Sequence, residues 1–187
     1  MLRKRFAKGA FAVATAMAMV VLPQAQAFAT VYGPYYLVDF NSQKCIDNPK
    51  SNPDNNVTMT IYTCLYGDNQ LWRNDNTPGT NKWWIRNVAS NKCLAVKNNS
   101  MDDNAPVLQF DCNLGTNEVW YYDYQNWSAY IDAPGVPSQQ EARAYKIRNV
   151  RSNKCLTVKN TGTANGATLL QFDCSKAGSN IWMQGET

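Results

Sequence analysis

The sequence of 187 residues contains no histidine. Histidine is the commonest general base, the usual partner of a nucleophilic serine or cysteine, and the commonest metal ligand. No pair of carboxylates is marked by its spacing for hydrolysing glycosides. Neither an EF-hand calcium loop nor a C-x-x-C pair is present. We therefore expect a protein that is not an enzyme and that holds no metal and no cofactor.

Long apolar runs are also absent, except for one near the N-terminus. Four basic residues stand among the first eight, an apolar run of 13 residues covers 10–22, and Ala25 and Ala27 offer small residues for cleavage. This layout is typical of a secretory signal peptide. The alternative is a transmembrane anchor, but a spanning helix needs roughly 20 apolar residues. We expect residues 1–27 to be a signal peptide and residues 28–187 to be secreted and extracellular.

The excess of positive charge lies within this N-terminal segment. The whole chain has 18 basic and 14 acidic residues, a formal net charge of +4. Removal of residues 1–27 takes four basic residues and no acidic ones, which leaves a formal net charge of zero. A basic patch is the usual electrostatic mark of nucleic-acid binding. We therefore expect no nucleic-acid partner and no membrane insertion.

The six cysteines follow one regular spacing. They stand at Cys45, Cys64, Cys93, Cys112, Cys155 and Cys174, and the two members of each consecutive pair are 19 positions apart. An even number of cysteines in an exported chain indicates disulfides, and six cysteines allow 15 pairings. The repeated spacing selects Cys45–Cys64, Cys93–Cys112 and Cys155–Cys174.

The cysteine pairs mark three sequence repeats. Residues 83–120 and 145–182 are identical at 19 of 38 positions when aligned without gaps, and the first repeat is more divergent. In every repeat a tryptophan follows the second cysteine by eight positions (Trp72, Trp120, Trp182), and an apolar residue precedes the first cysteine by eight (Leu37, Ile85, Ile147). Short β-branched and aromatic segments alternate with Asn, Asp, Gly and Ser, which favours four short strands in each repeat.

These features predict an all-β fold, a β-trefoil of three repeats with about twelve short strands and three disulfides within repeats. A single repeat buries too little apolar surface to be stable, so the three must share a core. We place the repeats at about 36–73, 83–121 and 145–183, within one domain over 28–187. Residues 121–144 form an aromatic-rich insertion, which we expect as a surface loop. A functional loop and an aromatic tether that seals the fold are equally good explanations of it.

The repeats resemble the ricin-B-type lectin domain, also called the R-type or QxW domain. The resemblance rests on KCID…IYTC…DNQLW, KCLAV…LQFDC…TNEVW and KCLTV…LQFDC…SNIW, and it covers nearly all of 36–183. It implies a β-trefoil that binds glycans, of the galactose type or related to it. The complete Gln-x-Trp motif stands only in the first repeat, and we assign its tryptophan and the two equivalent ones to the core.

The resemblance implies one main sugar site, in the first repeat. A sugar offers hydroxyls and an apolar C–H face, so a site needs a carboxylate, amides and an aromatic ring. The first repeat carries all of them in the family's positions: Asp47, Tyr62, Asn69 and Gln70. Thr60 departs from the glutamine that many members have there. An Asx turn at Asp47 and Asn69 is the structural alternative.

The other two repeats keep an aromatic residue and lose the acid. Ala95 and Thr157 replace the carboxylate, with Phe110 and Phe172 as the aromatic residues. We expect these repeats to be structural, or to be weak sites that use other residues such as Asp111 and Asp173.

Two further functions remain open on sequence alone. The chain could be a targeting or adaptor subunit of a secreted toxin or enzyme assembly, with a protein partner. A β-trefoil protease inhibitor that uses residues 121–144 ranks below both, because it does not account for the QxW-like pattern.

Overall fold

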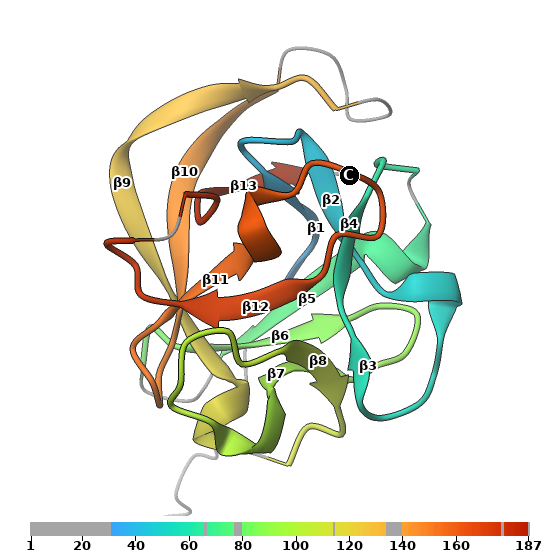
Figure 1. The fold of residues 1–187 in the computed structure, drawn as a ribbon. Helices are drawn as coiled ribbons and strands as arrows, with labels where there is room; N and C mark the ends of the chain where they lie inside the picture. Colours follow the sequence, from blue (N-terminus) through green and yellow to red (C-terminus); the bar gives the residue numbers. More distant parts are fainter. Residues whose placement is uncertain are drawn as a thin grey trace, which may run out of the picture.

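The computed structural model describes residues 31–65, 67–76, 80–113, 115–133, 140–176 and 178–186. These residues form an all-β fold of thirteen strands joined by short 3-10 turns (Figure 1). The strands are β1 (Val31–Asp39), β2 (Lys44–Asp47), β3 (Val57–Thr58), β4 (Thr60–Tyr62), β5 (Leu71–Asn76), β6 (Trp83–Asn87), β7 (Cys93–Val96), β8 (Val107–Phe110), β9 (Val119–Ile131), β10 (Gln140–Asn149), β11 (Cys155–Val158), β12 (Leu169–Phe172) and β13 (Trp182–Glu186). The 3-10 turns are η1 (Pro49–Ser51), η2 (Asp68–Gln70), η3 (Lys97–Asn99), η4 (Thr116–Glu118) and η5 (Lys159–Thr161).

The predicted signal peptide, residues 1–27, lies outside the described residues. In the described part of the chain, no helix has the length and apolar character needed to cross a membrane.

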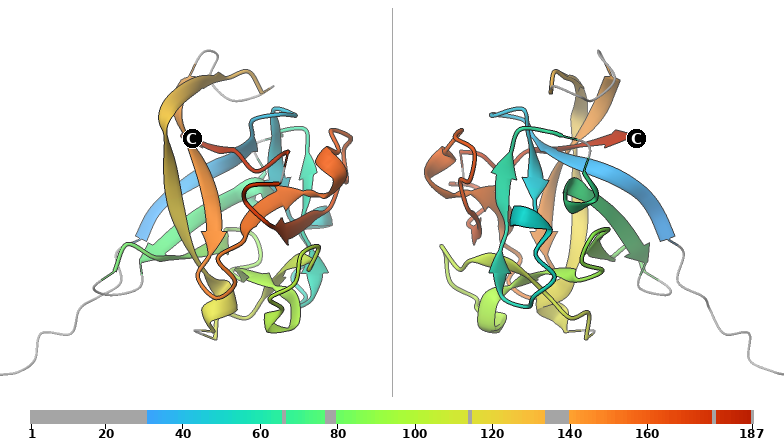
Figure 2. Two further views of the ribbon diagram at one scale, coloured as in Figure 1. Left: turned by 60° about the vertical axis from the view of Figure 1, so that its left-hand side comes forward. Right: turned by 90° about the vertical axis from the view of Figure 1, so that its right-hand side faces the viewer.

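The strands form a six-stranded barrel with three hairpins. β1, β5, β6, β9, β10 and β13 pair in a closed ring, and each repeat contributes its first and last long strand to it. The pairs β2–β4, β7–β8 and β11–β12 are the hairpins, gathered at one end of the barrel (Figure 2). This arrangement confirms the predicted β-trefoil. The additional strand is β3, which pairs with β8 of the next repeat.

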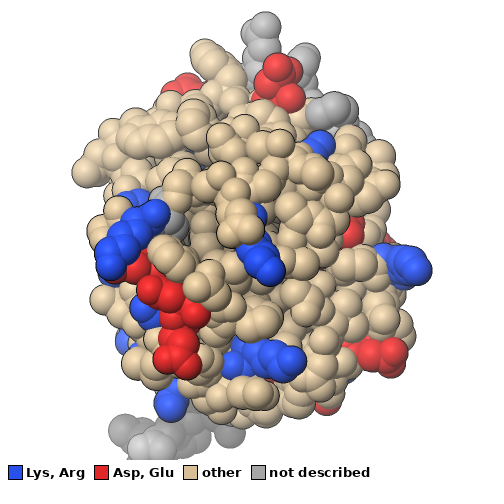
Figure 3. Space-filling view, viewed as in Figure 1, with Lys and Arg blue, Asp and Glu red and all other residues tan. Residues whose placement is uncertain are grey.

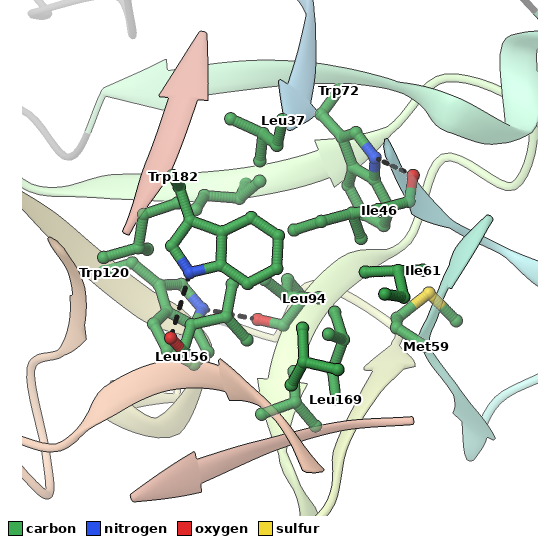
Figure 4. Close-up of a cluster of buried hydrophobic side chains, with 14 of the residues drawn as sticks. Leu37, Ile46, Met59, Ile61, Trp72, Leu94, Trp120, Leu156, Leu169 and Trp182 are labelled. Carbon is green, nitrogen blue, oxygen red and sulfur yellow. Dashed lines mark hydrogen bonds between the residues drawn. The ribbon is translucent and has the colours of Figure 1, made fainter. Parts of the chain in front are cut away.

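The three equivalent tryptophans lie at the centre of the core. Trp72, Trp120 and Trp182 are each at most 1% exposed. Each indole N–H donates to a backbone carbonyl of the hairpin strand in its own repeat, and these bonds measure 3.2, 2.8 and 2.9 Å (Figure 4). Because a buried indole N–H needs a partner, these bonds orient the rings as well as satisfy them. The core assignment of the tryptophans is confirmed.

All three predicted disulfides are present, and each joins the first strand of a hairpin to the residues just after the second. Cys45–Cys64, Cys93–Cys112 and Cys155–Cys174 have the same Cα–Cα distance of 5.1 Å. Closing a loop of this length stabilises the fold by roughly 3 kcal/mol in the chain-entropy model.

Neighbouring repeats are joined through buried glutamines. Gln109 of the second repeat donates from Nε2 to the carbonyls of Asn52 and Asp54 in the first repeat, at 2.7 and 2.8 Å. Gln171 of the third repeat makes the same pair of bonds to a loop of the second. The equivalent position in the first repeat is Ile61, which is fully buried in the core. A buried glutamine therefore stands at two of the three junctions, whereas the third has an isoleucine there and is bonded instead through Thr63, whose N–H donates to Asn165 Oδ1 at 2.9 Å.

The insertion at 121–144 differs from the expected surface loop, because most of it is a β-hairpin. β9 and β10 pair from Trp120↔Asn149 to Ile131↔Gln140, with a register shift between Arg143 and Tyr145. The ribbon extends well beyond the rest of the barrel (Figure 1). Alternating β-branched and aromatic residues favour this pairing over an irregular loop.

The hairpin is packed against the first repeat. Ile131, Ala133 and Ala142 are buried in a second apolar cluster with residues of β1 and the Cys45–Cys64 disulfide. Trp127 meets Phe40 edge to face, with ring centroids 5.1 Å apart. These contacts fit the aromatic-tether explanation, while Tyr130 stays 64% exposed.

Several charged side chains on the surface are paired with opposite charges. Ion pairs include Arg86–Asp75 and Lys92–Asp111, both at 2.6 Å. On the face shown in Figure 3, positive and negative side chains lie close together, and most of the surface is uncharged. This face therefore has no large patch of one sign.

Candidate functional site

The four predicted site residues lie on three elements of the first repeat. Asp47 ends β2, Tyr62 ends β4, and Asn69 and Gln70 lie in η2. In the β2–β4 hairpin Asp47 is directly opposite Thr60, so Tyr62 projects from the same face two positions further along. Residues related in this way lie within reach of an aromatic side chain.

Asp47 is held by the two amides that the sequence singled out. Its Oδ1 accepts from Asn69 Nδ2 at 2.7 Å and from Gln70 Nε2 at 3.1 Å. The structure therefore brings three of the four residues into direct contact. Both amides are themselves fixed: Asn69 also donates to the Asn48 carbonyl at 3.2 Å, and Gln70 to the Thr63 carbonyl at 3.0 Å.

The second carboxylate oxygen of Asp47 has a different environment. In the part of the chain that the structure describes, no hydrogen bond engages Oδ2, although Asp47 is 94% buried. Burial raises the pKa of the Asp47 carboxyl, and the hydrogen bonds from Gln70 and Asn69 oppose this shift. Because the two amides fix Oδ1, they also fix the orientation of the whole carboxylate. Oδ2 then remains as the acceptor for a ligand hydroxyl.

Tyr62 supplies the apolar surface of the site. Its side chain is 40% exposed, unlike its hairpin neighbour Ile61, which is completely buried. An exposed tyrosine ring on the same hairpin face as Asp47 can stack on the C–H face of a sugar while the carboxylate accepts hydroxyls.

The asparagine side chain of η2 lies directly over a glycine. A Cβ at Gly67 would lie 2.5 Å from Asn69 Oδ1, and one at Gly115 would lie 2.6 Å from Asn117 Oδ1. The sequence of the third repeat has Ala177 at this position and Ser179 in place of the asparagine. In the first two repeats a larger residue at the glycine position would displace the asparagine side chain from its present place.

Asn117 shows which part of this arrangement is structural. It donates to the Val96 carbonyl at 3.0 Å, the same bond that Asn69 makes to Asn48. The asparagine thus closes the turn whether or not an acid is present. Only in the first repeat does it also hold a carboxylate.

The corresponding positions in the other repeats line cavities. A cavity of about 220 Å³ in the second repeat is lined by Ala95, Phe110 and Glu118, and one of about 180 Å³ in the third by Thr157 and Phe172. By the threefold relation, Asp47 and Tyr62 occupy positions that line a recess in both sister repeats.

Asp111 and Asp173 are not among the residues that line these cavities. Lys92 and Asn55 bond to Asp111 and hold the pKa of its carboxyl below the usual value. The backbone and side chain of Ser175 do the same for Asp173. Both carboxylates are engaged on the surface.

Two polar residues at these sites were missed from the sequence. Asn48 is completely buried next to Asp47, where the sister repeats have valine, and its Oδ1 has no hydrogen-bond partner among the residues that the structure describes. Glu118 is 1% exposed and accepts from the Asn113 backbone N–H at 3.0 Å. The sequence signal that could have identified them is the difference between repeats. Asn48 stands where the other two repeats have valine, and Glu118 stands where the other two have an amide residue.

The described residues contain no group of three His, Cys, Asp or Glu side chains that could hold a metal ion.

Comparison with solved structures identifies similar folds. The designed threefold-symmetric protein ThreeFoil has a TM-score of 0.71 and 27% identity, covering 83% of this chain and 100% of its own. An exo-β-1,3-galactanase from Clostridium thermocellum has a TM-score of 0.69 and 24% identity over 82% of this chain, which corresponds to 30% of the galactanase chain. The Rhizoctonia solani agglutinin has a TM-score of 0.65 and 16% identity, covering 91% of this chain and all of its own.

A search of curated proteins finds no match. The model of the ricin-type beta-trefoil lectin domain-like family matches residues 24–110 and 116–187. With the trefoil, the three disulfides and the repeated tryptophans, this match shows that the chain belongs to the ricin-type beta-trefoil lectin domain-like family.

Proposed function

We propose that the protein is a secreted lectin whose main sugar site lies in the first repeat, around Asp47. The observation that carries the proposal is the state of this carboxylate. Two amides engage Oδ1, no hydrogen bond from a described residue engages Oδ2, and the exposed Tyr62 lies on the same face of the hairpin as Asp47. A site prepared in this way accepts hydroxyls and stacks on the sugar ring without rearrangement.

The proposed ligand class is galactose-type glycans. Support comes from the family membership and from the fold shared with a protein named as an exo-β-1,3-galactanase. A carboxylate that accepts from two adjacent hydroxyls distinguishes sugars by the orientation of those hydroxyls. The first repeat would therefore select among sugars in addition to binding them.

The test compares Asp47→Ala with Thr157→Ala, which changes the equivalent position of the third repeat. The second repeat naturally has alanine there, so the fold accepts it. Each protein is screened on a glycan array and titrated with lactose. Loss of charge-assisted hydrogen bonds predicts about tenfold or greater weakening for Asp47→Ala and none for Thr157→Ala. Equal binding by Asp47→Ala and the unchanged protein would refute the proposed site.

Export is tested separately. Expression of the full chain followed by N-terminal sequencing of protein from the culture medium should give Phe28 as the first residue. Retention inside the cell with Met1 still present would contradict it.

A role as the binding part of a larger assembly is the second candidate. Two observations favour it: in the galactanase the shared fold makes up only 30% of the chain, and the hairpin exposes Trp127 and Tyr130. Purification from native culture medium should then yield a complex with a toxin or enzyme chain. A lone monomer that binds glycans would count against this candidate. The protease-inhibitor alternative stays a prediction without a supporting contact.

A further inference from the structure

A cavity of about 260 Å³ lies at the end of the barrel away from the three hairpins. Its walls come from β1, β10 and β13. The hairpins and the core lie toward Asp39 of β1, Asn149 of β10 and Trp182 of β13. The cavity lies toward the opposite end of each of these strands. The cavity is therefore separate from the site around Asp47 and from its counterparts in the other repeats. The open end of a barrel is a common place for ligands.

The long hairpin creates this opening. β10 pairs with β13 only at Ala144↔Met183 and Tyr145↔Trp182, and beyond these residues β10 continues alongside β9. β13 continues alongside β1 as far as Glu186. The ladder between β10 and β13 therefore ends at these residues, and further along Gln140 Oε1 of β10 accepts from the Glu186 N–H of β13 at 3.1 Å. The cavity lies between the two strands along this stretch.

Two tyrosine rings line the cavity from opposite strands, Tyr35 from β1 and Tyr145 from β10. Tyr145 is fixed by its neighbours, since its ring centroid lies 5.4 Å from that of Tyr122 and 5.8 Å from that of Tyr124. Tyr122 in turn donates from its hydroxyl to Asn74 Oδ1 at 2.9 Å. The apolar part of the cavity is thus a preformed aromatic surface.

The polar groups of the cavity carry both signs. Arg143 and Glu141 come from β10 and Glu186 from β13. Within the described residues, no hydrogen bond engages the Arg143 guanidinium, the Glu186 carboxylate or the hydroxyls of the two lining tyrosines. Arg143 instead lies over the face of Tyr124, 5.8 Å from the ring centroid, which leaves the N–H groups at its edge for a ligand.

This combination of groups fits a neutral, hydroxyl-rich ring better than an ion. A cavity lined by groups of both charges does not favour a ligand that is only positive or only negative. A hydroxyl both donates and accepts hydrogen bonds, so it matches a guanidinium, a carboxylate and an amide together. The tyrosine rings match the C–H face of such a ligand. A volume of about 260 Å³ is below the roughly 300–1,000 Å³ of sites for drug-sized molecules, so one ring fits.

We propose that the opening between β10 and β13 is a second saccharide site, which binds one hexose-sized unit of an uncharged glycan. It is made by the hairpin insertion and does not depend on the site around Asp47. Its expected affinity is in the millimolar range, as for a single ring held by a few hydrogen bonds.

The test is an NMR titration with the methyl glycosides of galactose, glucose and mannose. It is carried out on the full secreted chain and on Asp47→Ala, which removes the first-repeat site. We expect the tyrosine ring signals of Tyr35 and Tyr145 and the side-chain amide of Gln140 to shift in both proteins with at least one glycoside. Exposed Arg143→Ala and Glu186→Gln should each weaken this binding about tenfold. The matched control is Arg151→Ala, an exposed arginine elsewhere that should leave it unchanged.

Two outcomes would overturn the proposal. The first is the absence of shifts at the three residues up to about 50 mM of every glycoside, which is well above a millimolar dissociation constant. The second is an unchanged dissociation constant, measured from these signal shifts, in both Arg143→Ala and Glu186→Gln. Loss of binding in Asp47→Ala alone concerns only the first-repeat site, so the two proposals fail independently.

Discussion

Replacing Gln109 with isoleucine tests how the repeats are held together. Gln109 is completely buried and makes three hydrogen bonds, to the carbonyls of Asn52 and Asp54 and from the Ser90 hydroxyl. Isoleucine is chosen because Ile61 already fills the equivalent position in the first repeat. The substitution therefore gives the junction between repeats one and two the same residue type that stands at the junction between repeats three and one.

The expected loss of stability follows from these bonds. Each is worth about 1 kcal/mol net, so their removal costs about 3 kcal/mol. The former partners do not all become unsatisfied: the Asn52 carbonyl keeps a bond from Asn48 at 2.9 Å, and Ser90 keeps one to Asn87 at 3.3 Å. Burying isoleucine instead of an amide returns about 1 kcal/mol. We expect a net destabilisation of about 2 kcal/mol, or about 4–8 °C in Tm.

The assay is urea unfolding with the disulfides intact, followed by fluorescence of the buried tryptophans. The midpoint should fall with an unchanged slope, since the surface exposed on unfolding stays the same. Gln171→Ile changes the other polar junction and should give a similar loss, additive with the first because the two share no partner. A change below about 0.5 kcal/mol for Gln109→Ile would refute the reasoning, since it would place the glutamines among positions of no structural consequence.

Three further outcomes are expected. Asn48→Val should leave the free energy of unfolding unchanged or raise it by up to about 1 kcal/mol, because removal of a buried amide oxygen without a partner among the described residues offsets the lost bond to the Asn52 carbonyl; a loss of more than about 1 kcal/mol would contradict this. Binding of lactose, measured by calorimetry, should decline as pH falls through a midpoint above the ordinary Asp value of 3.8, because burial raises the pKa of Asp47 and the ionised form accepts the hydroxyls; an Asp47→Asn protein should show no such step. Replacing Cys93 and Cys112 with alanine should cost about 2–5 kcal/mol in chemical unfolding, and a loss below 1 kcal/mol would show that the loop is closed without the disulfide.

Features that recur in register could be predicted from the sequence. The trefoil, the three disulfides and the buried tryptophans each appear three times at fixed spacing, so every repeat supports the assignment in the other two. For the same reason, Asp47 stood out as a departure from Ala95 and Thr157. The contact of its Oδ1 with Asn69 and Gln70 agrees with the predicted grouping.

Features that depend on a neighbouring repeat could not be predicted in this way. Gln109 meets its carbonyl partners across 55 and 57 positions of sequence, and nothing in its own repeat shows that these carbonyls need a donor. The insertion was expected as a loop because Pro134, Gly135 and Pro137 indicate a turn, whereas the pairing of β9 with β10 depends on residues on both sides of it. The cavity beside Tyr145 lies where the pairing of β10 with β13 ends, and no sequence pattern marks that point.

The first repeat differs from its sisters in a way that separates site from framework. At two adjacent positions it has Asp47 and Asn48, where the second repeat has Ala95 and Val96, and both polar residues are buried. A buried polar group with an unmatched atom costs about 1–3 kcal/mol, and the sister repeats show that the fold does not need it. Asn117 closes its turn without an acid, so the asparagine alone marks the framework. A local loss of stability confined to one of three equivalent positions is what the proposed sugar site would impose on a fold whose other repeats supply the stability.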